Sequence, residues 1–260
     1  MAHGRLGVLA TTILLVATGI TTGITSTAPA SAAGRGLPSH FSLDRSVRQL
    51  VTVTSPRWSD TSARMRVWNR RANGGWRMVR GPVRVSLGWN GWAPARQRRQ
   101  STGTTPAGRF SMRYAFGTRA DPGGKVRYRR VDRNDFWPYE PRDPATYNIF
   151  QPSKARATRW RTDYRERLAD YRREYAYSVV LGFNLPRGVH WSKARRQYVA
   201  QNRADTRRGG GIFLHVKEQR YTAGCVSGPI RDIRWVVRWL NPSVRPRIVM
   251  GPHAWVKRRF

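Results

Sequence analysis

The chain has 260 residues and carries 49 Lys and Arg against 14 Asp and Glu, which gives a formal net charge of +35. Eleven Trp and ten Tyr supply apolar surface to bury, so the composition excludes a disordered basic tail. A charge this positive favours a polyanionic partner such as nucleic acid, an acidic membrane surface or an anionic cell wall. The length allows one large domain or two small ones.

Residues 1–32 have the pattern of a secretory signal peptide. A short basic start precedes an uncharged run from Leu6 to Ile20, and small residues then offer cleavage sites near Ala32. A membrane anchor is the alternative, but the apolar run is shorter than the about 20 residues that a spanning helix needs. We therefore expect a secreted protein, extracellular or in the cell wall, with no transmembrane segment after cleavage. Export favours wall polymers over nucleic acid as the partner.

The part of the chain that follows predicts antiparallel β-structure. Residues 33–45 are rich in Gly, Pro and Ser and predict a flexible tether. Residues 46–80 predict a β-hairpin region around the turn Ala72-Asn-Gly-Gly75, and we expect it to pack on the following domain. Val83 to Leu87 alternate with polar residues, which is typical of a half-buried strand. Residues 88–110 have the composition of a loop.

The middle of the chain alternates between irregular and apolar segments. Residues 121–144 are polar and rich in proline, which predicts a long irregular segment. Aromatic residues at helical spacing predict a helix from about Ala155 to Tyr175, and core packing explains this stripe better than a sugar-stacking platform does. The apolar runs Tyr177 to Asn184 and Ile212 to Val216 predict buried strands. Residues 186–211 between them form a basic, glycine-rich excursion.

The C-terminal part predicts one more helix and one more strand. Pro229 suits the first position of a helix. The buried stripe of that helix would consist of Ile230, Ile233, Val237 and Leu240. Arg247 to Met250 predict a last strand, and residues 252–260 predict a basic tail. The predicted fold class is therefore mainly β with a few helices.

Cys225 is the only cysteine and the candidate reactive group. In a secreted chain it has no internal disulfide partner, which leaves an inert buried thiol, an intermolecular bridge or a working thiol. His215 lies ten residues earlier and can act as its base. A helix beginning near Pro229 would lower the thiol pKa through its positive end. Gly224 lets the backbone bend, so that the N–H groups of Gly224 and Cys225 can form an oxyanion hole.

Other chemistries find less support. A structural thiol and a hydrogen-bonded core histidine remain the plain alternatives for Cys225 and His215. Metal binding is disfavoured, because one Cys and scattered His residues match no ligand spacing. The acidic residues show no obvious pair for glycoside hydrolysis. Neither a Walker-type loop nor a Gly-x-Ser-x-Gly element occurs. We expect no metal and no cofactor.

The segment Ile212-Phe-Leu-His215, followed by Thr222-Ala-Gly-Cys225-Val226, resembles the catalytic signature of the L,D-transpeptidases (YkuD-like). Enzymes of this family are secreted by bacteria and cross-link peptidoglycan through a cysteine. Thr104 to Phe110 resembles the family's Thr-Pro-x-Gly-x-Phe element, and Tyr177 to Asn184 resembles a strand that precedes the catalytic segment. The resemblance implies an L,D-transpeptidase-like β-sandwich catalytic domain over residues 81–251.

The resemblance also implies roles for individual residues. Cys225 is the nucleophile and His215 is its base, and the backbone carbonyl of Val216 orients the histidine. The amides of Gly224 and Cys225 are the expected oxyanion donors.

Two positions depart from the family pattern. Ala223 stands where many members have a second histidine, and Ser227 stands where many have Arg or Asn. Thr222 and Ser227 are then the candidates for hydrogen bonds to a peptidoglycan stem peptide.

The implied reaction forms 3→3 peptidoglycan cross-links through a thioester and releases D-alanine. Two alternatives stay open at this point. One is an L,D-carboxypeptidase that trims stem peptides, and the other is a non-catalytic cationic protein that binds anionic cell-wall polymers.

Overall fold

A computed structural model describes residues 36–156, 160 and 163–260. The predicted signal peptide and the start of the predicted tether lie outside these residues. Within the described part, the fold class predicted from the sequence, mainly β with a few helices, is confirmed.

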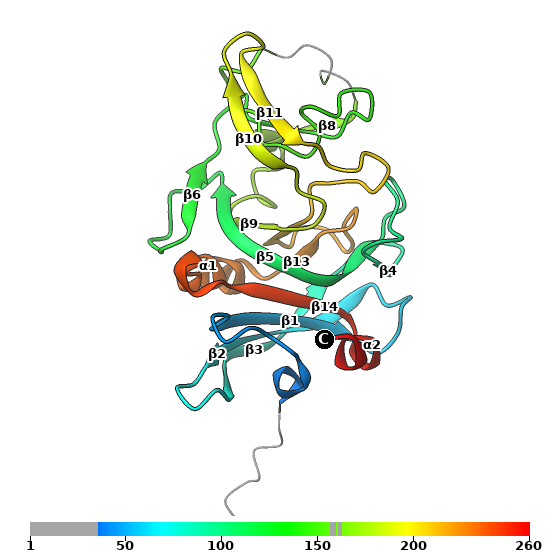
Figure 1. Ribbon diagram of the computed structural model, residues 1–260, viewed down its shortest axis with the longest axis vertical. Helices are drawn as coiled ribbons and strands as arrows, with labels where there is room; N and C mark the ends of the chain where they lie inside the picture. Colours follow the sequence, from blue (N-terminus) through cyan, green and yellow to red (C-terminus); the bar gives the residue numbers. More distant parts are fainter. Residues whose placement is uncertain (1–35, 157–159, 161–162) are drawn as a thin grey trace, which may run out of the picture. The chain divides into compact units, whose positions relative to one another are not determined.

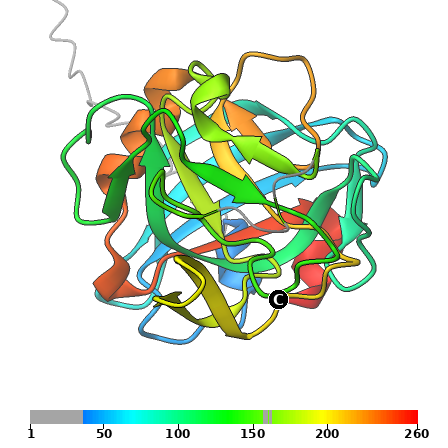
Figure 2. The same cartoon turned by 90° about the horizontal axis from the view of Figure 1, so that it is seen from above.

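Most strands in the described part belong to one ten-stranded sheet. They are β1 (Gln49–Ser55), β2 (Ser62–Arg70), β3 (Trp76–Ser86), β4 (Trp92–Pro94), β5 (Thr105–Gly117), β6 (Arg127–Arg130), β9 (Ser178–Leu181), β12 (Phe213–Val216), β13 (Val226–Gly228) and β14 (Arg247–Pro252). The order is β14-β1-β2-β3-β13-β12-β9-β5-β4, with β6 beside β5. Because β14 also pairs with β5, the sheet closes on itself (Figures 1 and 2).

The remaining elements are short. β7 (Phe136–Pro138) pairs with β8 (Arg165–Arg167), and β10 (Arg187–Ser192) pairs with β11 (Gln197–Asn202). The helices are α1 (Ile230–Trp239) and α2 (His253–Arg259), and the 3-10 turns are η1 (Leu37–His40), η2 (Leu168–Tyr171) and η3 (Pro242–Val244). Figure 1 shows the β10–β11 hairpin at the end of the domain opposite β1, β2 and β3.

The main core lies inside the closed sheet and gathers apolar side chains from many strands and from α1. Examples are Val51, Met112, Leu214, Ile233 and Ile248. A second cluster covers the outer face of β9 and β12, so these two strands are buried on both faces. Their near-unbroken apolar sequences reflect this double burial. The two central strands predicted from the sequence are therefore confirmed.

The predicted hairpin is also confirmed. β2 and β3 pair antiparallel from Ser62 with Ser86 to Arg70 with Trp76, around the glycine-rich turn. β3 is longer than predicted, because it joins the segment after the turn to the strand expected at Val83. β1 pairs with β14, so the hairpin region belongs to the same sheet as β12 and β13.

Both chain ends pack in their described parts, which differs from the predicted tether and tail. Phe41 and Leu43 are buried in a cluster with Leu50 and Val256. Val256 belongs to α2, which occupies most of the predicted basic tail. A few apolar side chains among polar neighbours are enough to anchor each segment, and their partners lie far away in the sequence.

The helix predicted from about Ala155 to Tyr175 is wrong in its described part, where β8 and η2 occur instead. Residues 157–159 and 161–162 of that prediction lie outside the described residues. Trp160, Leu168 and Tyr175 are buried, whereas Tyr164 and Tyr171 are exposed, so core packing explains only part of the aromatic stripe. The helical spacing was therefore coincidental.

Two predicted loops contain strands. The predicted loop 88–110 contains β4 and the start of β5, and the irregular segment 121–144 contains β6 and β7. Glycine and proline suggested loops here, but β4 pairs in parallel with β5 at Thr105 to Ala107. Tertiary pairing overrode the local preference.

α1 carries the buried stripe that the sequence predicted, with two differences. Ile233, Val237 and Leu240 are buried, but Ile230 is exposed. Pro229 precedes the first helical residue instead of occupying it.

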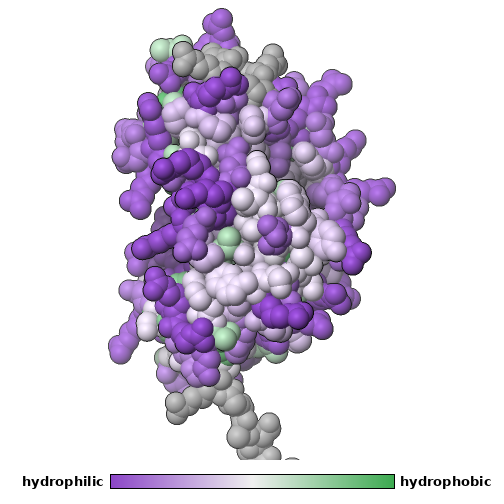
Figure 3. All heavy atoms as spheres, turned by 90° about the vertical axis from the view of Figure 1, so that its right-hand side faces the viewer, coloured by the Kyte–Doolittle hydropathy of each residue, from purple (hydrophilic) through white to green (hydrophobic). Residues whose placement is uncertain are grey.

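The surface is largely hydrophilic. Figure 3 shows hydrophilic side chains around a patch of intermediate hydropathy on the face at the right of Figure 1. None of the helices in the described ranges has the length and apolar character needed to cross a membrane.

Candidate functional site

His215 and Cys225 lie on the same face of the sheet. β12 and β13 are parallel, with His215 opposite Ser227 and Leu214 opposite Val226. Side chains alternate along a strand, so this register puts Phe213 and His215 on the face that Cys225 joins just before β13. Packing agrees, because Cys225 and Phe213 belong to the same apolar cluster. The Tyr175 ring lies 5.5 Å from the His215 ring, measured between centroids.

The Cys225 thiol is buried and held by the backbone. Cys225 is only 9% exposed to solvent. Sγ donates to the Gly211 carbonyl at 3.3 Å and accepts from the Phe213 amide at 3.3 Å. Burial raises the thiol pKa to about 12, and the negative charge of Glu166 adds to this rise. The thiol is therefore protonated at neutral pH.

The turn before Cys225 requires glycine. Gly224 has φ +136°, a conformation that side chains other than glycine rarely adopt, and a Cβ there would lie 2.8 Å from the Thr104 carbonyl oxygen. Thr222 closes the turn, because its Oγ1 donates to the Cys225 carbonyl at 2.8 Å and accepts from the Gly224 amide at 3.1 Å.

These bonds change two sequence predictions. The Gly224 N–H, predicted as an oxyanion donor, is already donated to Thr222. The Cys225 N–H forms no hydrogen bond with another described residue, so it is the remaining amide donor of the pair. Thr222, predicted to contact substrate, instead uses its hydroxyl to hold the turn.

His215 is neutral and its ring is oriented. Nδ1 lies 2.8 Å from the Val216 carbonyl oxygen, as predicted. A carbonyl only accepts, so Nδ1 carries the proton and Nε2 keeps a lone pair. Burial lowers the His215 pKa from 6.5 to about 4, although the carbonyls of Val216 and Glu174 oppose this shift. The ring is therefore available as a base at neutral pH.

The two groups are not hydrogen-bonded to each other. Among the bonds of the described residues, Cys225 Sγ contacts Gly211 and Phe213 but not His215. A neutral histidine and a protonated thiol form no resting ion pair. Hydrogen bonds between catalytic groups often tighten only when substrate binds, so a thiol and an imidazole that are unpaired at rest are compatible with proton transfer between them.

The predicted helix effect on the thiol is wrong. β13 lies between Cys225 and α1, so the helix begins five residues after the cysteine. A helix dipole acts mainly within its first turn. The positive charge near the thiol comes instead from Arg98, which lowers the Cys225 pKa.

Arg98 was missed by the sequence reasoning. It is 4% exposed and donates from Nε to Thr104 at 2.9 Å and from Nη1 to the Arg208 carbonyl at 2.6 Å. A Cβ on Gly224 would lie 2.9 Å from its Nη2, so the guanidinium borders the cysteine turn. It lies in residues 88–110, which the sequence predicted to be a loop.

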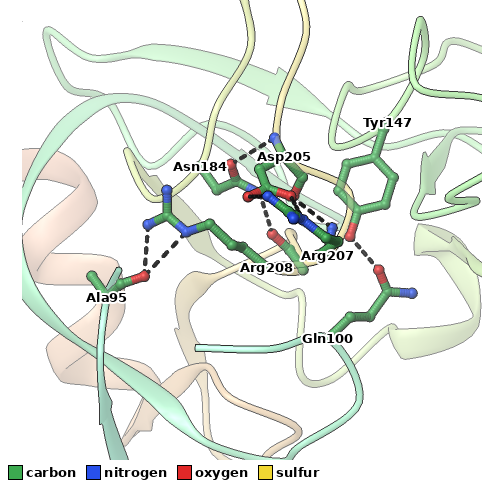
Figure 4. A network of polar contacts seen from close by, with 8 residues as sticks. Ala95, Gln100, Tyr147, Asn184, Asp205, Arg207 and Arg208 are labelled. Carbon is green, nitrogen blue, oxygen red and sulfur yellow. Dashed lines mark hydrogen bonds and ion pairs between the residues drawn. The ribbon is translucent and has the colours of Figure 1, made fainter. Parts of the chain in front are cut away.

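A polar network fixes the loop that leads to Gly211 (Figure 4). The Asn184 amide donates to the Asp205 carbonyl at 2.8 Å and accepts from the Asp205 amide at 3.1 Å. The Arg208 guanidinium donates to the Ala95 carbonyl at 2.6 and 3.2 Å. The network thereby positions the Gly211 carbonyl that holds the Cys225 thiol.

Glu166 and its tyrosines form a second group that the sequence did not indicate. The Tyr175 hydroxyl donates to Glu166 Oε2 at 2.7 Å. Burial raises the pKa values of Glu166 and of the nearby Tyr139, and the charge of Glu166 adds to the rise for Tyr139. The Tyr139 hydroxyl is buried beside this carboxyl group. β8 supplies Glu166, so the segment predicted as a helix covers the site.

Two serines flank His215 in the sheet. Ser227, predicted to contact substrate, lies opposite His215 on β13 but is only 1% exposed. Ser178 lies opposite His215 on β9, and its buried Oγ has no partner among the described residues. Neither hydroxyl reaches solvent in this conformation.

The fold and the site define a sheet-rich domain with one histidine and one cysteine on the same face of two parallel strands. The family model of the L,D-transpeptidase catalytic domain (YkuD) matches residues 58–249, which is most of the chain. The chain belongs to this family, as the resemblance indicated, and this assigns it an activity of the L,D-transpeptidase type on peptidoglycan stem peptides. A search of curated proteins finds no match.

Proposed function

We propose that this chain is an exported cysteine L,D-transpeptidase that forms 3→3 cross-links in peptidoglycan. The observation that carries the proposal is the placement of Cys225 and His215 on one face, with His215 Nδ1 fixed by the Val216 carbonyl. This arrangement leaves Nε2 as a base directed away from that carbonyl.

The first half-reaction acylates the cysteine. The thiol proton moves to His215 Nε2 as Sγ attacks the carbonyl carbon of the third stem residue, a diamino acid. The tetrahedral intermediate then collapses, the C–N bond to D-alanine breaks, and the imidazolium returns its proton to the leaving amine. The product is a thioester. The Cys225 N–H is the amide available to stabilise the oxyanion.

The second half-reaction transfers the acyl group. His215 deprotonates the side-chain amine of an acceptor stem, and that amine attacks the thioester carbonyl. The C–S bond breaks and the thiol regains its proton, so the enzyme returns to its starting state. No metal or cofactor takes part in either step.

Acylation by a carbapenem tests the nucleophile, because such compounds acylate the cysteine of this family. We expect the wild-type chain to gain one adduct by intact-protein mass spectrometry and the Cys225→Ala chain to gain none. His215→Gln should slow adduct formation while its circular dichroism spectrum stays unchanged. An adduct that survives Cys225→Ala would overturn the assignment.

Incubation with tetrapeptide muropeptides separates transfer from hydrolysis. Cross-linked dimers support the transpeptidase, whereas tripeptides alone support the L,D-carboxypeptidase. The burial of Cys225 favours transfer, because a thioester at this position is shielded from bulk water. If neither product forms, the non-catalytic wall-binding alternative remains, and the raised pKa of the thiol fits that alternative.

We also propose that the mature protein acts outside the cell and is retained by anionic wall polymers. The signal-like residues 1–32 and the net charge of +35 support this. Attraction between a cationic surface and a polyanion is screened by salt, with a Debye length of about 8 Å at physiological ionic strength. Release from isolated cell walls should therefore rise steeply with salt concentration.

A further inference from the structure

A cavity of about 450 Å³ lies beside β5 and β6, away from Cys225. Tyr114 lines it and stacks on Trp137, with ring centroids 6.4 Å apart. Trp137 in turn contacts Phe213, at 4.9 Å between centroids, and Phe213 adjoins Cys225. The cavity and the cysteine thus border the same aromatic cluster. Asn148 also lines the cavity and accepts from the Gly211 amide at 2.8 Å, so the cavity adjoins the segment that holds the thiol, although Cys225 itself does not line it.

The cavity has a strongly positive wall. Arg113, Arg127 and Arg129 line it, and Arg113 and Arg127 are exposed. All fourteen acidic residues lie in the described ranges, and none is within ion-pair distance of Arg113 or Arg127. The carboxylate of Asp135 lies 3.6 Å from Arg129 Nε and neutralises that arginine alone. Two arginines therefore remain free for an anion.

Part of the lining is apolar. Leu185, Pro186 and Val189 belong to it, and Val189 is an exposed apolar side chain. A volume of about 450 Å³ lies in the range of roughly 300 to 1,000 Å³ that small-molecule sites occupy. Apolar side chains that share a cavity with free guanidinium groups suit a ligand with a C–H-rich ring face and an attached anion. A sugar that carries a phosphate or carboxylate has this form.

The aromatic rings here do not suit single-stranded nucleic acid. The Arg129 guanidinium already covers the Phe150 ring, 4.3 Å from its centroid. The Tyr198 ring makes an edge contact with Trp191, at 5.3 Å between centroids. Nucleic-acid platforms offer a series of open ring faces on which successive bases stack. Free arginines beside apolar side chains in a cavity of this volume favour the sugar.

We propose that this cavity binds an anionic saccharide unit of a wall polymer, with Arg113 and Arg127 on the anion and Leu185, Pro186 and Val189 against the ring. The assignment of the saccharide to a cell-wall polymer rests on the proposed function, whereas the binding site for an anionic saccharide does not. The site would hold the enzyme on polymer next to its stem-peptide substrate and turn a diffuse charge attraction into specific recognition.

Calorimetric titration at fixed ionic strength tests the site. The probes are trigalacturonate and glucose 6-phosphate, which separate carboxylate from phosphate, and maltotriose is the neutral control. We expect at least one anionic probe to bind and maltotriose not to bind. Arg113→Gln and Arg127→Gln should each weaken binding about tenfold, the loss expected for a hydrogen bond to a charged group. Both residues are exposed, so thermal unfolding should be unchanged.

Arg77→Gln on β3 is the matched control, because it removes the same charge from an exposed position far along the sheet. It should change affinity less than about twofold, as expected for an unspecific surface charge. Equal weakening by Arg77→Gln and Arg127→Gln would overturn the proposal in favour of a general field effect. A single-stranded oligonucleotide that displaces the probe through Arg113 and Arg127 would overturn it in favour of nucleic acid.

A cross-linking assay with muropeptides, run on the wild type and on both arginine variants beside the titration, separates this proposal from the proposed enzyme. Binding that depends on Arg113 and Arg127 without any cross-linking by the wild type would leave the cavity site standing and remove the transpeptidase. Cross-linking together with unchanged binding in both arginine variants would do the reverse.

Discussion

Replacing His215 with Gln tests the physical state on which the proposed base depends. Burial lowers the His215 pKa from 6.5 to about 4, so the unfolded chain binds a proton at a higher pH than the folded chain does. The free energy of unfolding therefore falls as the pH is lowered from about 6.5 to about 4. A pKa difference of about 2.5 at about 1.4 kcal/mol per unit gives a loss of about 3 kcal/mol. Above pH 6.5 this group contributes no pH dependence.

Urea unfolding of wild type and His215→Gln between pH 4 and pH 7.5 measures this contribution. Gln keeps a donor for the Val216 carbonyl but does not titrate. Acidic side chains act equally in both proteins, so the difference between the two curves isolates His215. We expect the wild type to lose about 3 kcal/mol more than the variant over this range. Parallel curves would show that His215 has the same pKa in the folded and the unfolded chain, which would refute the reasoning about its burial.

Three further predictions follow from the site and the core. With a pKa of about 12, Cys225 should react with iodoacetamide at pH 7 roughly a thousandfold more slowly than a free cysteine. Glu166→Gln should raise that rate, because it removes a negative charge near the thiol. A rate equal to that of a free cysteine would contradict the burial of Cys225. Gly224→Ala places a Cβ 2.8 Å from a backbone oxygen in a residue with φ +136°. Urea denaturation should therefore show a decrease of about 1–3 kcal/mol in the free energy of unfolding. An unchanged free energy would mean that the turn relaxes. Asp232 is buried and pairs with Arg80 at 2.7 Å, so Asp232→Ala should cost about 1–3 kcal/mol by the same assay, and a neutral result would mean that Arg80 is solvated.

The sequence alone located the reactive segment and its strands. The apolar runs around Val180 and Leu214 predicted β9 and β12, because a strand that is buried on both faces has a nearly continuous apolar sequence. The spacing of His215 and Cys225 after such a strand, with the upstream Thr-Pro element, indicated the family that the comparison confirmed. The carbonyl that orients His215 was predictable for a local reason, since it belongs to the next residue.

Only the tertiary structure determined which side chains surround Cys225 and how they are hydrogen-bonded. Arg98, Glu166 and Tyr175 reach the cysteine from segments 50 to 127 residues away, and no local pattern marks such contacts. The occupied Gly224 amide depends on the rotamer of Thr222. The aromatic spacing before Tyr175 suggested a helix, but only part of that stripe is buried, and β8 and η2 occur there instead. Sequence periodicity specifies which side chains leave water, whereas long-range packing chooses their partners and thereby sets the pKa values and the orientation of the groups around Cys225.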